Sequence, residues 1–411
     1  MEFKKIITPA PIKNKLKELV QHNRLSHALL FLGREGSGAL PLAIAFAQYV
    51  LCEKINPSSS KQGSSLFGGE NNRSEPIYWE DSCGTCSSCL KVKQLIHPDL
   101  HFSYPVLKRD SNHTRVLSTD YISEWREFIQ QYPYNNVADW IDFLKENSKS
   151  KIDNPANKQG NITVFECDDI SHKLSLKSFE SDYKILIMWM PEFLGKEGNK
   201  LLKLIEEPPP NTLFIFVAED EGAILPTILS RTQLIKIPSL SNKEVEYALE
   251  EHYQVASEKA TRIASLCEGN FREALQLIEN QEEDLQSQVR EWLNIVLKKD
   301  SSAQIKWIDE ISKTGREKQK QFLKYFIHLL EQAIRIRFLK EENRILIPQN
   351  EKDFALRINN MCSDSGIEEM IKELGNAIYF IERNAHAKML FHALTIRLFH
   401  IIKDNSLILV H

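Results

Sequence analysis

The chain has 411 residues, of which 42% are hydrophobic and 26% are charged. This length predicts two to four domains, and the composition excludes a wholly disordered or fibrous protein. Lys and Arg number 52 against 56 Asp and Glu, which gives a formal net charge of −4. This balance argues against a protein that grips nucleic acid over its whole surface, while a local basic face remains compatible with it.

Membrane and secretion signals are missing from the sequence. The longest apolar runs, such as residues 213–218, are far shorter than the roughly 18 residues of a membrane-spanning helix. The first ten residues, MEFKKIITPA, lack the apolar core of a secretory signal. We therefore expect a cytoplasmic protein. The seven cysteines are an odd number, which argues against a disulfide framework.

The first part of the chain predicts an α/β domain. Residues 12–20 have helical periodicity, residues 28–32 form an apolar run suited to a buried strand, and residues 40–51 form an apolar, alanine-rich helix. Further along, residues 184–190 and 213–218 are uninterrupted apolar runs with a helical stretch, 198–206, between them. Such strands are covered on both faces, which predicts a parallel sheet.

Two stretches interrupt this pattern. Residues 56–76 are rich in Ser, Gly and Asn, and we expect them to form a mobile surface loop. Residues 100–106 alternate like a strand, and the following residues, 107–160, resemble an insertion that carries two helices, at 122–131 and 136–146.

The strand pattern nearly stops after Pro238. Ser241 and Glu244 form a possible capping box, and helices are expected at 257–267, at 271–280 and from about 285 nearly to the end. The predicted fold class is therefore α/β plus all-α. Its domains are an α/β domain at 1–238, a small helical domain at 239–284 and a helical C-terminal domain at 285–411.

A glycine loop, residues 33–40, connects the first strand to the helix after it. Gly33, Gly36 and Gly38 suit a phosphate-binding loop, in which backbone N–H groups converge at the start of a helix. However, Ala39 stands in place of the lysine of the G-x-x-x-x-G-K-[ST] pattern, and Leu40 in place of its hydroxyl. The missing lysine alone weakens nucleotide binding roughly ten- to a hundredfold. A tight turn that binds no nucleotide is therefore favoured.

A second strand end supports this interpretation. A hydrolytic P-loop protein places an acidic residue after an apolar strand to hold magnesium. Here residues 185–188 lead into Trp189 and Met190, and Glu192 follows two residues later.

Three cysteines, Cys83, Cys86 and Cys89, have C-x₂-C-x₂-C spacing. Two thiolates at this spacing can bind one tetrahedral metal, so zinc is the natural ligand in a reducing compartment. Cys52 and His97 are both possible fourth ligands. Three free surface cysteines or an iron–sulfur cluster are the less favoured alternatives. Two arginines, Arg231 and Arg272, lie at the ends of predicted elements, where solvated surface arginines are common.

Together these motifs resemble the bacterial clamp-loader AAA+ subunits. The resemblance rests on RLSHALLFLG at 24–33, the cysteine motif, HPDL at 97–100, NKLLKLIEEPP at 199–209 and TILSR at 227–231, which occur in family order. Within the family the chain resembles the delta-prime branch of DNA polymerase III, which keeps the zinc module and the Ser-Arg pair while its ATP site decays. The motor subunits, gamma and tau, are expected to keep the lysine and the acidic residues.

The resemblance implies roles for individual residues. Arg231 falls at the position of an arginine finger that acts on ATP of a neighbouring subunit, with Thr232 replacing the usual cysteine. Arg272 falls at the second sensor arginine, and Glu219 lies near the first sensor, where Thr or Asn is expected. Gly33, Gly36, Gly38 and Arg272 would form a degenerate nucleotide site, in which ATP or ADP binding is doubtful. Zinc would be held by Cys52, Cys83, Cys86 and Cys89.

The resemblance also implies an architecture and a function. The three domains become an AAA+ domain with a zinc module at about 52–97, a helical lid and an oligomerising collar. The implied function is that of a non-hydrolysing subunit that helps to load the sliding clamp onto primed DNA, with gamma/tau-like and delta-like partners. The insertion at 107–160 has no counterpart in the family pattern. The alternatives are a gamma/tau-like ATPase motor and a zinc-dependent nucleic-acid-binding regulator.

Overall fold

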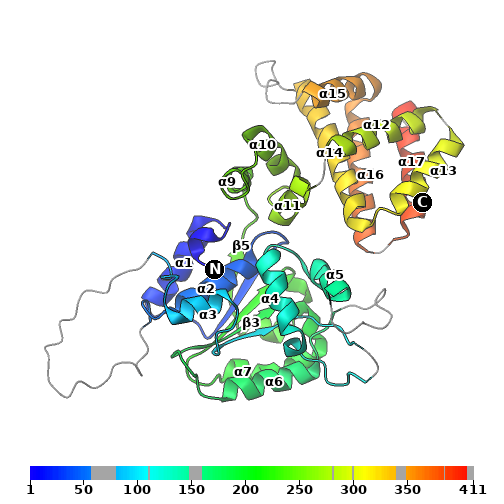
Figure 1. The fold of residues 1–411 in the computed structure, drawn as a ribbon. Helices are drawn as coiled ribbons and strands as arrows, with labels where there is room; N and C mark the ends of the chain where they lie inside the picture. The colour runs from blue at the N-terminus through cyan, green and yellow to red at the C-terminus, as the bar shows by residue number, and fades with distance from the viewer. Residues whose placement is uncertain are drawn as a thin grey trace, which may run out of the picture. The chain divides into compact units, whose positions relative to one another are not determined.

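The fold was analysed in a computed structural model, which describes residues 1–56, 80–109, 112–147, 160–279, 282–298, 300–338, 349–383 and 385–404. Most of the predicted loop at 56–76 and the end of the predicted insertion lie outside these residues. The chain divides into two compact units, Met1–Gln276 and Leu277–His411 (Figure 1). This division does not test the predicted boundaries between an AAA+ domain, a lid and a collar, which stay predictions.

A five-stranded parallel sheet forms the centre of the first unit. Its strands lie in the order β2-β3-β4-β1-β5, and every pair is parallel. They are β1 (Ala28–Gly33), β2 (Leu100–Ser103), β3 (Lys184–Trp189), β4 (Thr212–Ala218) and β5 (Gln233–Ile237). The predicted mixed α/β architecture with a parallel sheet is thus confirmed. The strand expected at 100–106 is shorter, and β5 was not predicted.

Helices cover both faces of this sheet (Figure 1). One face packs against α1 (Ala10–Gln21), α2 (Ala39–Leu51), α4 (Ile122–Gln131) and α5 (Val137–Asn147). The other face packs against α6 (Val164–Ser175), η5 (Pro191–Leu201), α7 (Leu202–Glu206) and α8 (Pro226–Leu229). Alternate residues of one strand enter opposite layers: Leu29 and Phe31 of β1 join the first, and Ala28 and Leu30 the second. This burial on both faces explains the uninterrupted apolar runs.

Shorter elements complete the first unit. They are η1 (Phe3–Lys5), α3 (Ser87–Lys93), η3 (Ser118–Tyr121) and η6 (Glu221–Ala223), followed by α9 (Asn242–Tyr253), α10 (Ser257–Leu266) and α11 (Phe271–Glu279). The capping box at the start of α9 is confirmed, because the Ser241 side chain accepts from the Glu244 backbone N–H and the Glu244 carboxylate accepts from the Ser241 N–H. Helix α11 spans the boundary between the two units.

The second unit consists of helices over the residues that the structure describes. They are α12 (Glu282–Lys298), α13 (Ser301–Ser312), α14 (Arg316–Phe338), α15 (Gln349–Met361), α16 (Asp364–Glu382) and α17 (Ala387–Asp404). Its core includes a stacked pair of indoles, Trp292 and Trp307, with ring centroids 5.0 Å apart. The Trp292 Nε1–H donates to the Thr395 hydroxyl, so this polar atom is satisfied inside the core.

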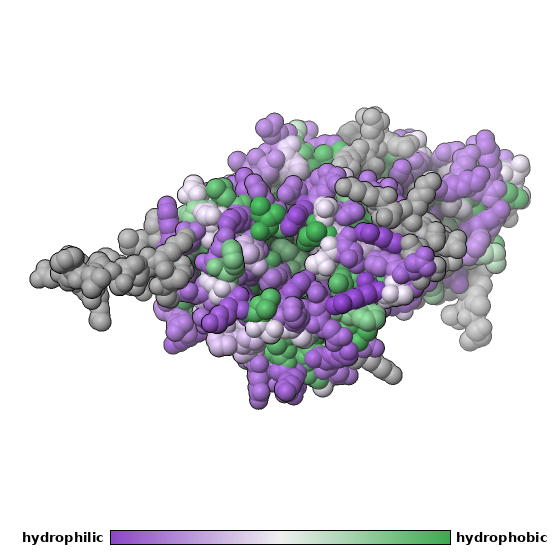
Figure 2. Space-filling model, turned by 60° about the horizontal axis from the view of Figure 1, so that its bottom comes forward, coloured by the Kyte–Doolittle hydropathy of each residue, from purple (hydrophilic) through white to green (hydrophobic). Residues whose placement is uncertain are grey.

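On the face drawn in Figure 2, hydrophobic residues lie interspersed among hydrophilic ones. Within the described ranges, no helix combines the length and apolar character that crossing a bilayer requires.

Candidate functional site

The glycine loop lies at the carboxyl end of β1, between its neighbours β4 and β5. Ligands of open parallel sheets bind at such strand ends, near the point where the strand order reverses. Gly36 and Gly38 have φ values of +70° and +79°, and Gly38 precedes the first residue of α2. The loop therefore has the strand–loop–helix context of a P-loop, and the glycines supply left-handed backbone that other residues rarely adopt.

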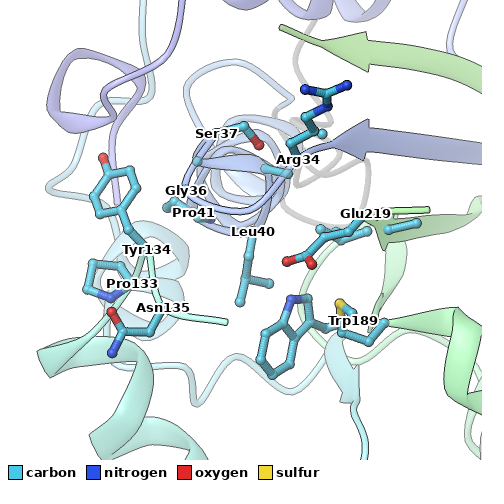
Figure 3. Close-up of a pocket in the computed structure, with 16 residues that line it drawn as sticks. Arg34, Gly36, Ser37, Leu40, Pro41, Pro133, Tyr134, Asn135, Trp189 and Glu219 are labelled. Carbon is cyan, nitrogen blue, oxygen red and sulfur yellow. The ribbon is translucent and has the colours of Figure 1, made fainter. Parts of the chain in front are cut away.

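Side chains line a small pocket in front of this loop (Figure 3). Leu40 points into the pocket from α2, opposite the Pro133–Asn135 segment and beside Trp189. The remaining cavity measures about 30 Å³. Since one water molecule needs roughly 10–15 Å³ by this measure, the pocket holds about two water molecules.

Trp189 closes the pocket at the end of β3. The centroid of its ring lies 5.3 Å from that of Trp125 and 6.4 Å from that of Phe128, both on α4. Trp125 in turn packs edge-to-face against Trp140 of α5, with ring centroids 5.2 Å apart. The predicted insertion thus builds an aromatic cluster against the strand end where a magnesium-binding carboxylate is expected.

Glu219, after β4, lines the pocket, and Glu192, after β3, contacts the backbone beside it. Glu192 accepts the backbone N–H groups of Glu219 and Asp220, at 2.7 and 3.0 Å, so it closes the turn after β4. Burial raises its pKa. Burial also raises the pKa of Glu219 to about 8, with a further contribution from the negative charges of Glu35 and Glu192.

Arg272 does not reach solvent. Its side chain is fully buried and pairs with the carboxylates of Asp139 and Glu35. The sequence placed this arginine at a helix start, where a solvated side chain was the simple expectation, but it did not indicate either partner. The partners lie 133 and 237 residues away in the chain, and no local pattern relates such positions.

Arg231 follows α8, at the rim of the sheet. Its side chain is 34% exposed and forms an ion pair with Glu206. Its Nη1 donates to the Thr227 carbonyl at 2.9 Å and to the Ser230 hydroxyl at 3.0 Å. The structure therefore places Arg231 away from the glycine loop's Arg272 network, with a partly exposed guanidinium anchored on its own helix end.

The four cysteines, Cys52, Cys83, Cys86 and Cys89, form a compact cluster. Their Sγ atoms all lie within 4.8 Å of one another. Cys52 is the residue directly after α2, Cys86 caps the N-terminus of α3, and Cys89 lies within α3. The described residues place His97 outside this cluster: its Nδ1 accepts the Asp99 N–H at 3.1 Å. Geometry thus favours Cys52 over His97 as the fourth ligand.

The cluster fits a tetrahedral metal ion. Four sulfurs at about 2.3 Å from a central zinc lie about 3.8 Å apart. Cys83 Sγ and Cys89 Sγ are separated by 3.9 Å. Backbone N–H groups also point at the sulfurs, from Cys86 to Cys83 Sγ at 3.3 Å and from Cys89 to Cys86 Sγ at 3.4 Å. Such donors stabilise thiolates, so the chemistry of the donor set suits a metal.

Fold and site together define a class of protein: a parallel α/β protein with a P-loop-type glycine loop, followed by helical segments and carrying a four-cysteine cluster. A family model described as DNA polymerase III, delta subunit, matches residues 8–241, which is more than half of the chain. The chain therefore belongs to the DNA polymerase III delta-subunit family, and it is similar to the delta-prime members.

Curated relatives agree with this family. DNA polymerase III subunit delta' of Bacillus subtilis is 25% identical over 263 residues, covering 64% of this chain and 57% of the relative. Subunit delta' of Haemophilus influenzae is 22% identical over 237 residues, covering 58% and 50%. Subunit tau of Bacillus subtilis is 22% identical over 282 residues, covering 67% and 37%. The chain thus spans about half the length of the delta' relatives that it matches.

Proposed function

We propose that the chain is a non-hydrolysing, delta-prime-like subunit of a DNA polymerase III clamp loader that helps to load the sliding clamp onto primed DNA. The observation that carries this proposal is the small pocket at the glycine loop, about 30 Å³ in volume. Its residues do not fit ATP, since Ala39 and Leu40 replace the lysine and the hydroxyl, and Trp189 fills the strand end. Family membership supplies the context of the clamp loader.

Arg231 is proposed to act on ATP bound to an adjacent subunit. Its guanidinium is about a third exposed, and Glu206 and the end of α8 hold it in position. An arginine supplied in trans stabilises negative charge on the transferring phosphoryl group and is worth roughly 10³–10⁵ in rate. Engagement requires Arg231 to exchange Glu206 for phosphate oxygens, which carry more negative charge.

The remaining proposals concern partners, metal and domains. The partners are gamma/tau-like and delta-like subunits, the sliding clamp and, through the assembled complex, primed DNA. One zinc ion per chain is held by Cys52, Cys83, Cys86 and Cys89 and has a structural role. Residues 239–284 act as the lid, and residues 285–411 act as the collar that joins the subunits.

A reconstituted clamp loader tests this function. The purified chain should show negligible ATP hydrolysis, while a complex with intact motor subunits should hydrolyse ATP and load clamps. Arg231→Ala should lower both activities of the complex without changing assembly or zinc content, and total turnover should fall only partly because other motor sites have their own arginines. Arg115→Ala, at an exposed position, serves as the control.

Two results would contradict the proposal. ATP turnover by the purified chain at the level of a P-loop motor, abolished by altering Gly38, would favour the gamma/tau-like alternative. Unchanged ATPase and clamp loading in the assembled Arg231→Ala complex would mean that this arginine has no role in trans.

A further inference from the structure

Arg272 is buried together with two carboxylates that face it from different segments. Its Nε and Nη2 donate to the two Asp139 oxygens at 2.5 and 2.6 Å, and its Nη1 donates to Glu35 Oε1 at 2.9 Å. The guanidinium is 0% exposed, whereas the Glu35 and Asp139 side chains are 27% and 20% exposed. A guanidinium cannot lose its proton, so burial requires partners of opposite charge.

The network joins three parts of the first unit. Glu35 belongs to the glycine loop, Asp139 to α5 and Arg272 to α11. Asn136, just before α5, donates to Glu35 Oε2 at 2.9 Å, and Asn270, just before α11, donates to Glu35 Oε1 at 3.3 Å. Glu35 is therefore shared by both helices, and the charged groups connect α11 to the loop and to α5 at once.

The backbone approaches closely at the same place. The Phe271 N–H donates to the Gly36 carbonyl at 3.2 Å. A Cβ atom at Gly36 would lie 2.0 Å from Asn270 Oδ1 and 2.7 Å from the Phe271 nitrogen, so only glycine allows this approach. The centroid of the Phe271 ring lies 4.9 Å from that of Tyr134 and 5.9 Å from that of Tyr253, the last residue of α9. Charged, backbone and aromatic contacts thus converge on the start of α11.

We infer that Glu35 and Asp139 fasten the α9–α11 segment to the glycine loop without any nucleotide, their carboxylates taking the place that an anionic ligand would occupy beside Arg272. Glycine loops and buried arginines both suit phosphate oxygens. Here the protein provides the oxygens itself, from Glu35 of the loop and from Asp139 of α5. On this inference the α9–α11 segment stays packed against the glycine loop whether or not a nucleotide is present. This goes beyond the proposed loss of hydrolysis.

Hydrogen exchange of the full chain tests this inference. In Asp139→Asn, one ionic partner of a buried arginine is lost, so amides of α9 and α11 should exchange at least tenfold faster. The matched control is Asp142→Asn on the same helix, where the side chain is 66% exposed and pairs with Lys145. This control should exchange like the wild type, and amides of α14 should be unchanged in both variants. Equal exchange at α9 and α11 in the two variants would overturn the inference.

Glu35→Gln provides a milder variant should Asp139→Asn fail to fold, because both Asp139 bonds to Arg272 remain. It should also speed exchange at α9 and α11, and wild-type exchange there would overturn the inference. Inorganic phosphate is the probe for the anion position. Millimolar phosphate should slow exchange in Glu35→Gln/Asp139→Asn and leave the wild type unchanged. Absence of this rescue would overturn the assignment of the carboxylates to an anion's position.

These measurements use the isolated chain, so their outcome is independent of clamp loading. A complex that fails to load clamps would contradict the proposed function and leave the exchange result standing.

Discussion

Trp189 stands where a hydrolytic P-loop protein needs a carboxylate, and it has become part of the hydrophobic core. It is 3% exposed and packs against Trp125 and Phe128. Leu40 is likewise 5% exposed and fills the space in front of the glycine loop. Both side chains therefore contribute apolar packing at this end of the sheet. A carboxylate introduced at position 189 would be buried without a partner rather than form a nucleotide site.

Glu219 predicts a pH dependence of stability. Its folded-state pKa of about 8 lies above the ordinary value of 4.5. Between these pH values the folded chain keeps a proton that the unfolded chain releases, so the free energy of unfolding falls as pH rises from about 5 to about 8. Glu219→Gln should remove this contribution, which is at most about 1.4 kcal/mol per pH unit. Urea unfolding of the wild type and of Glu219→Gln at pH 5.5 and 8 measures this contribution. An equal change in the free energy of unfolding between the two pH values in both proteins would contradict the prediction.

The cysteine cluster predicts one zinc per chain. Cys86→Ser removes a thiolate from the tetrahedral set, so zinc content should fall well below one atom per chain, and the unit should unfold at lower temperature. Metal analysis by mass spectrometry checks this. Cys167→Ser, at a buried cysteine on α6 outside the cluster, should keep its zinc. Stoichiometric zinc in Cys86→Ser would show that the cluster is not the site.

At the scale of elements, the close contact between the glycine loop and the start of α11 requires that residue 36 has no side chain. Gly36→Ala places a Cβ against Asn270 and Phe271 on a backbone with φ of +70°, so it should destabilise the chain by about 1–3 kcal/mol. Gly375→Ala is the control, because this helical glycine has nothing within 4 Å and alanine there should stabilise by about 0.5–1 kcal/mol. Thermal unfolding compares the two. Equal shifts would contradict the close approach at Gly36.

Most helices and strands of the sheet followed from apolar periodicity, as for α4, which the sequence predicted at residues 122–131. Strand β5 and helix α6 were not predicted; the sequence of β5, QLIKI, has neither a continuous apolar run nor a strict polar–apolar alternation. Apolar periodicity also does not predict the strand order, because a pattern along the chain carries no information on which strands pair.

For the candidate site too, local patterns were predictable from the sequence and long-range pairings were not. The glycine loop, Trp189 and the three cysteines Cys83, Cys86 and Cys89 are visible as local patterns, whereas the fourth ligand was left open between Cys52 and His97; the structure brings Cys52 to the other three. The pairing of Arg272 with Glu35 and Asp139 was not visible, since it joins residues more than a hundred positions apart. The same kind of long-range packing brings residues 133–135, between α4 and α5, to the pocket and Trp125 of α4 against Trp189.

At the scale of the whole molecule, the second unit has its own core, centred on Trp292 and the buried side of α14. Units with separate cores can fold independently. We expect a chain truncated after residue 284 to stay soluble and to lose co-purification with partner subunits, because we propose that the helical C-terminal residues supply the assembly surface. Affinity purification from a co-expressing strain measures this. Retained co-purification would move the main interface to the first unit.

The strand order has a consequence for the protein's synthesis. Strand β1 pairs only with β4 and β5 among the described strands, and about 180 residues separate the end of β1 from the start of β4. At roughly 5–20 residues per second, a ribosome needs about 9–36 s to add them. During that time β1 and helix α2, every residue of which is buried in the folded chain, have left the tunnel without their partners. We therefore expect the nascent chain to expose this buried segment until β4 and β5 have emerged.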